Sequence, residues 1–84
     1  MIIKLSDGYE VEIRESVLKK WSFTKLLREA DKNSLMIIDV AEAVLEEGEL
    51  DKLEKHLDKD GDPDAEAMIE VIKEIMEAEE LKNS

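Results

Sequence analysis

The sequence predicts a small, mostly helical α+β domain in which an N-terminal β-hairpin precedes about four helices. Apolar residues alternate with polar residues from 2 to 13, which is the period of a strand with one solvated face. Most of the remaining chain shows helical periodicity instead. The chain has 84 residues, and a second core would need roughly another 50. We therefore treat residues 1–84 as a single domain.

The predicted hairpin covers residues 2–13. Its apolar residues are Ile3, Leu5, Tyr9, Val11 and Ile13. A three-residue turn at 6–8, with Gly8 in the left-handed conformation, places Leu5 opposite Tyr9 and keeps the apolar residues on one face. A two-residue turn would place Leu5 opposite Glu10 and mix the two faces, so we expect the three-residue turn. A lone hairpin is marginal in water, so its apolar face should lie on helices.

The helices are expected at about 15–32, 34–47, 49–57 and 63–80. In the first, residues 15–20 form a short helical turn, and Ser22 then caps a longer segment. Trp21 would precede the cap and pack on Leu26 as a hydrophobic staple. Ser34 is expected to cap the second helix, and Gly48 to end it.

The second helix is apolar around most of its circumference, which is typical of a helix at the centre of a fold. The third, with leucines at 50, 53 and 57, has one apolar face. The last should begin near Asp62 or Asp64, with Pro63 in its first turn. The apolar stripe expected to be buried on this last helix is Met68, Ile69, Ile72, Ile75 and Met76.

The charge of the chain is strongly acidic and unevenly distributed. It has 23 acidic and 12 basic residues and a net charge of −11. Residues 46–84 carry −10 of this, whereas residues 14–32 carry +3. Nucleic-acid binding depends mainly on Lys and Arg that neutralise phosphates, so no nucleic-acid partner is expected.

Several classes of chemistry lack their residues in this sequence. There is no Cys, and His56 is the only His, so thiolate chemistry and His-based zinc sites are excluded. No apolar run approaches the roughly 20 residues of a membrane span, and no signal peptide is recognisable, which predicts a soluble intracellular protein. Without a nucleophile motif or a phosphate-binding glycine loop, we expect neither an enzyme nor a cofactor.

The acidic tract from Asp58 to Asp64 invites comparison with a calcium-binding EF-hand loop. In the register that begins at Asp58, Pro63 occupies the glycine position and Ile69 the final acidic position. In the register that fits Gly61, the first position is His56 and the last is Ala67. Neither register closes the site, so we interpret the tract as a turn before a capped helix and expect no metal.

The order of features along the whole chain resembles the small tail assembly chaperones of long-tailed, siphophage-type bacteriophages and prophages of Gram-positive hosts. The matching features are the hairpin at 3–13, Trp21, Leu26-Leu27-Arg28-Glu29-Ala30-Asp31, the apolar helix ending Val44-Leu45, His56-Leu57, the Asp60-Gly61 turn, Glu66-Ala67-Met68 and the end Leu81-Lys82-Asn83-Ser84. The resemblance covers nearly the full length.

This resemblance implies non-catalytic protein binding in the host bacterial cytoplasm. Its implied partners are the tape-measure protein, which such chaperones coat and keep soluble, and the tail-tube protein, which they help to recruit. The charge asymmetry adds the hypothesis that copies associate head to tail as a homo-oligomer. An alternative function is an acidic regulatory or nucleic-acid-mimic protein that binds a basic site on its partner.

A tape measure is a long helical chain with apolar stripes, so its chaperone needs an apolar acceptor surface. The last helix is our candidate, because methionines adapt to irregular partners. Trp21 has two interpretations, a core residue, which we favour, and a partner-binding anchor. The candidate partner-binding residues are Met68, Ile72, Ile75, Met76 and Trp21.

Overall fold

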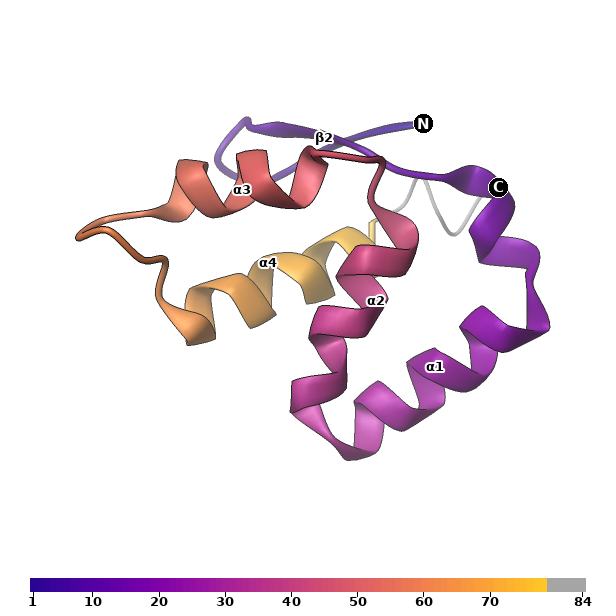
Figure 1. The fold of residues 1–84 in the computed structure, drawn as a ribbon. Helices are drawn as coiled ribbons and strands as arrows, with labels where there is room; N and C mark the ends of the chain where they lie inside the picture. The colour runs from indigo at the N-terminus through magenta and orange to yellow at the C-terminus, as the bar shows by residue number, and fades with distance from the viewer. Residues whose placement is uncertain (79–84) are drawn as a thin grey trace.

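The computed structural model describes residues 1–78, which form a two-stranded antiparallel sheet followed by helices (Figure 1). The elements are β1 (Ile2–Lys4), β2 (Glu10–Glu12), the 3-10 helix η1 (Glu15–Lys19), α1 (Trp21–Lys32), the 3-10 helix η2 (Ser34–Met36), α2 (Ile37–Val44), α3 (Glu49–Leu57) and α4 (Ala65–Met76). The predicted α+β class, with a hairpin before mostly helical structure, is confirmed.

The hairpin has the predicted register. Ile3 pairs with Val11, and the Leu5 backbone N–H donates to the Tyr9 carbonyl at 2.7 Å. Gly8 has a φ of +92°, a conformation that favours glycine, so the three-residue turn is confirmed. The inward side chains of both strands are buried against the helices, as the marginal stability of a lone hairpin requires.

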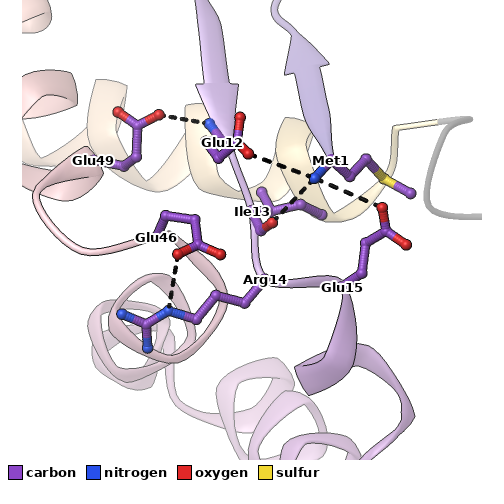
Figure 2. Close-up of polar contacts among 7 residues, drawn as sticks. All are labelled: Met1, Glu12, Ile13, Arg14, Glu15, Glu46 and Glu49. Atoms are coloured by element: carbon purple, nitrogen blue, oxygen red, sulfur yellow. Dashed lines mark hydrogen bonds and ion pairs between the residues drawn. The ribbon is translucent and has the colours of Figure 1, made fainter.

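The segment between α2 and α3 pairs with β2 and with the residue that follows it. Ile13 forms a β-bridge with Leu45, and the Glu46 N–H donates to the Glu12 carbonyl at 3.0 Å. On the same strand, the Glu12 N–H donates to the Glu49 carboxylate at 2.8 Å, at the start of α3 (Figure 2). This pairing satisfies backbone groups at an edge of the hairpin and joins the sheet to the helices.

The charged groups around this junction lie close to one another at the surface (Figure 2). Arg14 Nε is 3.9 Å from Glu46 Oε2, and the Met1 amino nitrogen is 3.6 Å from Glu15 Oε1. The Met1 amino group also donates to the Ile13 carbonyl at 3.4 Å. Exposed ion pairs of this kind contribute little, so backbone pairing and burial hold the junction.

The start of α1 differs from the prediction. The helix already includes Trp21, its N-cap is Lys20, and no side chain caps it, so the predicted Ser22 cap is wrong. Residues five apart in a helix are about 140° apart around the axis, so Trp21 cannot pack on Leu26 as a staple. Phe23 is buried instead, and Leu26 follows it on the inward face.

The segment predicted as one helix at 34–47 is divided. Asn33, not Ser34, provides the cap, because its side-chain oxygen accepts from the Leu35 N–H at 3.1 Å. The chain then passes through η2 into α2, which ends three residues before the predicted position because Leu45 and Glu46 pair with the hairpin. Its inward residues are buried, which confirms its central place: Ile37, Val40, Ala41 and Val44.

The last two helices begin in different ways. Gly48 does not end the second helix, which stops at Val44, but is the N-cap of α3, with a φ of +82°. Leu53 on α3 is fully buried. Asp64 caps α4, since its carboxylate accepts from the Ala67 N–H at 3.0 Å. The helix predicted at 63–80 therefore begins later and ends at Met76, and Pro63 lies before it, bridged to Asp58, instead of in its first turn. Residues 79–80 of that prediction lie outside the described residues.

The core lies where α2, α3, α4 and the inner face of the hairpin meet (Figure 1). Its buried residues are Ile3, Leu5, Val11, Ile13, Phe23, Ile37, Val40, Ala41, Val44, Leu45, Leu53, Ile72 and Ile75. Among residues 1–78, no helix has the length and apolar character that crossing a membrane requires.

Candidate protein-interaction surface

The first hollow in the surface lies between α2, α3 and the start of α4 and has a volume of about 330 Å³. Leu35 and Ile38 form one wall, and Met68 and Ile69 of α4 contribute to the other. Leu35 is 71% exposed and Ile38 is 54% exposed. These two large aliphatic side chains are thus largely in water, beside a hollow that is itself mainly apolar.

A second hollow, of about 300 Å³, lies between α1 and α4. Leu27 and Ala30 of α1 line one side, and Ile69 and Met76 of α4 line the other. The two hollows share Ile37, Ile69 and Ser34, so they are neighbours. We refer to them together as the paired hollows.

The paired hollows carry more acidic than basic side chains. Glu54 and Asp62 line the first, while Asp31 and Glu77 line the second. The one basic residue that lines either hollow within residues 1–78 is Lys73. The first hollow is thus mainly apolar and the second is mixed, and the charged side chains that line them, which we call the rim, are predominantly acidic.

The structure separates the predicted partner-binding residues of α4. Met68 and Met76 are half-buried and line the first and second hollow respectively, so they are accessible to a partner. Ile72 also lines the first hollow, but it is 3% exposed, and Ile75 is fully buried in the core, so neither offers a partner much surface. Met68 lies near the start of α4 and Met76 is its last residue.

The predicted site lacked several residues that line the paired hollows, among them Leu35, Ile38 and Ile69. The sequence did contain a signal for the first two. A helix needs only about one apolar face to pack on a core, and segment 35–47 is apolar around most of its circumference. That excess of apolar surface indicates a second contact, outside the domain or within it.

Trp21 is 75% exposed and lines neither of the paired hollows, so the core interpretation favoured for it is wrong. It is the first residue of α1 and follows Lys19 and Lys20 in the chain. Its role as a partner anchor stays a prediction. Its neighbours in the chain are basic, unlike the mainly acidic charged residues that line the paired hollows.

His56 lies beside the hairpin turn. Its Nε2 atom is 2.7 Å from Asp7 Oδ2, and its ring stacks on Tyr9 with the centroids 4.0 Å apart. The hydrogen bond with His56 is the main cause of a lowered pKa of Asp7, followed by the bond donated by the Tyr9 N–H. All three side chains form contacts that hold the hairpin turn against α3, so we assign them a structural role.

The acidic turn between α3 and α4 uses its carboxylates locally. Asp58 Oδ1 accepts from the Gly61 N–H at 2.7 Å, and Asp64 caps α4. Within residues 1–78, no three His, Asp or Glu side chains are grouped as metal ligands. The geometry of the tract is that of a turn leading into a capped helix.

Comparison with protein-family models, with curated proteins and with solved structures produced no match to this chain.

Proposed function

We propose that this protein is a tail assembly chaperone that binds the tape-measure protein of a long-tailed bacteriophage and helps to recruit tail-tube subunits. It acts by protein–protein interaction and performs no catalysis. The observation that carries the proposal is an apolar surface, the paired hollows with exposed Leu35 and Ile38, on a domain with a net charge of −11. The resemblance of the sequence to such chaperones supplies the identity of the partner.

The apolar surface and the high net charge suit a chaperone of a long helical protein for separate reasons. Apolar stripes on an unassembled tape measure would associate with one another, and an apolar hollow that covers them prevents this. The high net charge then repels neighbouring complexes and keeps them in solution. The hollows are small, so each contact buries little area and a tail-tube subunit can displace the chaperone.

Co-expression with a tape-measure protein tests this proposal. The wild-type protein should increase the fraction of the tape measure in the supernatant, measured on quantitative gels. Ile38→Gln should lose most of this effect, because it replaces a wall of the first hollow with a polar side chain. Ile2→Gln is the matched control, since Ile2 is also an isoleucine, is 56% exposed and lines neither hollow.

The proposed function is contradicted if the wild-type protein leaves the tape measure insoluble while it is itself abundant and folded. An equal effect of Ile38→Gln and Ile2→Gln would contradict the assignment of the surface.

The alternative function, an acidic regulator of a basic partner, is favoured by the exposure of many carboxylates in the second half of the chain, among them Asp60, Asp62, Glu66 and Glu70. Binding through these groups would weaken steeply with added salt, because exposed charges are screened within about 10 Å at 0.1 M. Apolar contacts in the paired hollows would persist. Salt-dependence of the purified complex therefore separates the two functions.

A further inference from the structure

We infer that the paired hollows bind an amphipathic helix with two apolar anchor side chains, about two helical turns apart, and with Lys or Arg on both flanks. This inference rests on the proposed function and specifies the segment of a partner that the chaperone recognises. Its basis is the placement of the hollows along α4 and the charges around them.

The spacing of the anchors follows from the geometry of α4. Met68 lines the first hollow and Met76 the second, while Ile69 lines both. Met68 and Met76 are eight residues apart, which corresponds to about 12 Å along a helix axis. A partner helix that runs beside α4 would place side chains seven residues apart, about 10 Å, in the two hollows.

The helical form of the partner follows from the shape and polarity of the surface. The walls of the hollows are formed mainly by residues of helices, and a helical partner satisfies its own backbone hydrogen bonds while presenting an apolar ridge. An extended peptide would need an unpaired strand edge beside the hollows, and their walls are formed by helices and by the turn around Pro63.

The charge of the partner follows from the rim. Four carboxylates, those of Asp31, Glu54, Asp62 and Glu77, line the hollows with a single Lys73. Basic residues that flank the apolar ridge would lie near these carboxylates, whereas acidic residues would be repelled. The rim thus discriminates between amphipathic helices that have the same ridge.

Synthetic helical peptides provide the test. The first has leucine anchors at positions i and i+7 with Lys flanks, the second the same anchors with Glu flanks, and the third Lys flanks with serine in place of both anchors. Binding is followed by NMR through the methyl groups of Met1, Met68 and Met76 in the full chain. The first peptide should shift the Met68 and Met76 signals and leave that of Met1, which lies at the hairpin, unchanged.

The affinities should differ between the peptides. We expect the Lys-flanked peptide to bind about tenfold or more tightly than the Glu-flanked one, and the serine peptide to lose saturable binding. In the protein, Ile38→Gln should weaken the first peptide about tenfold. Glu54→Gln should reduce the preference for Lys flanks, and Glu10→Gln on the hairpin is its matched control, because Glu10 is exposed and lines neither hollow.

The outcomes distinguish this inference from the proposed function. If the wild-type protein solubilises the tape measure and the first peptide leaves Met68 and Met76 unshifted, the inference is overturned and the function stands. Equal affinity for Lys-flanked and Glu-flanked peptides would overturn the charge preference. If the first peptide binds at the methionines but the tape measure stays insoluble, the proposed function fails and the helix-binding surface remains.

Discussion

Trp21 and Phe23 show how two nearby aromatic residues acquire different environments. Both belong to α1, and residues two apart in a helix point about 200° apart around the axis. Phe23 is 3% exposed and contributes to the core, whereas Trp21 is 75% exposed. At the residue scale, this rotation around the helix axis places Phe23 in the core, where it stabilises the domain, and leaves Trp21 accessible to a partner.

Substitution of these two residues by alanine should have unequal effects on stability. Trp21→Ala should change the free energy of unfolding by less than about 0.5 kcal/mol, because little area is lost from the core. Phe23→Ala should cost about 3–5 kcal/mol, since it leaves a cavity. Urea unfolding followed by far-UV circular dichroism measures both values. A larger loss for Trp21→Ala would contradict the described start of α1.

The contact between Asp7 and His56 should make stability depend on pH. The folded-state pKa of Asp7 is lowered from its ordinary value of 3.8, mainly by the hydrogen bond with His56. A lowered pKa means that the contribution is present at higher pH and is lost as the pH falls below 3.8, through the folded-state value. The stability difference between wild type and Asp7→Asn should therefore be present near pH 7 and disappear in this acidic range.

Urea unfolding at a series of pH values measures this difference. In a His56→Gln background the effect of Asp7→Asn should be smaller, because the main partner of the carboxylate is gone. An unchanged effect in that background would show that the turn, rather than His56, determines the contribution of Asp7.

At the scale of elements, the link between α2 and α3 determines the arrangement of the helices. α2 stops at Val44 because the next residues pair with β2, and the chain then turns through Gly48 into α3. Gly48 has a φ of +82° and a ψ of −12°, which L residues with a β-carbon rarely adopt. This conformation orients α3 so that it contacts both β2 and α4.

Replacement of Gly48 should test this role. A β-carbon at this position would meet no atom within 4 Å, so any cost comes from the backbone conformation and not from a clash. We expect Gly48→Ala to lower the free energy of unfolding by about 1–2 kcal/mol and Gly48→Asn by less, because asparagine tolerates positive φ. Thermal and urea unfolding give the order, and equal losses for the two variants would contradict this explanation.

At the scale of the whole molecule, negative charge is the main unfavourable electrostatic feature. The net charge is −11, and within residues 1–78 the Lys and Arg ion pairs have exposed basic side chains and N–O distances of 3.9 Å. Such pairs contribute little, so they offset only part of the repulsion between carboxylates. The same charge that would keep the proposed chaperone in solution therefore destabilises the folded state.

Added salt should accordingly stabilise the protein. Raising KCl from about 0.02 M to about 0.5 M shortens the screening length several-fold, and relief of about 1 kcal/mol would raise Tm by about 4–8 °C in a domain of this size. Differential scanning calorimetry measures the shift. The variant Asp60→Lys/Glu70→Lys, which alters two exposed acidic residues, should show a smaller shift. A Tm that falls with KCl would contradict the dominance of repulsion.

Local physical rules in the sequence determined the hairpin and much of the helical pattern. The alternation of apolar residues, with Gly8 at the turn, specified the register, because a shift of one residue would expose the apolar face. The last helix was expected near Asp62 or Asp64, and Asp64 caps it. In the candidate site, Met68 and Met76 are half-buried and line the paired hollows, and their contact with a partner stays a prediction.

Only the tertiary structure decided which apolar residues stay outside the core. Periodicity defines the apolar face of a helix but does not say what covers that face. It therefore favours a core position for Trp21 and allows a contact surface at Ile72 and Ile75, whereas Trp21 is exposed and the two isoleucines are buried. The exposure of Leu35 and Ile38 depends on where α3 and α4 pack, and the end of α2 depends on pairing with a strand about thirty residues earlier. The fold was thus largely set by neighbouring residues, whereas the surface was set by segments that meet only after folding.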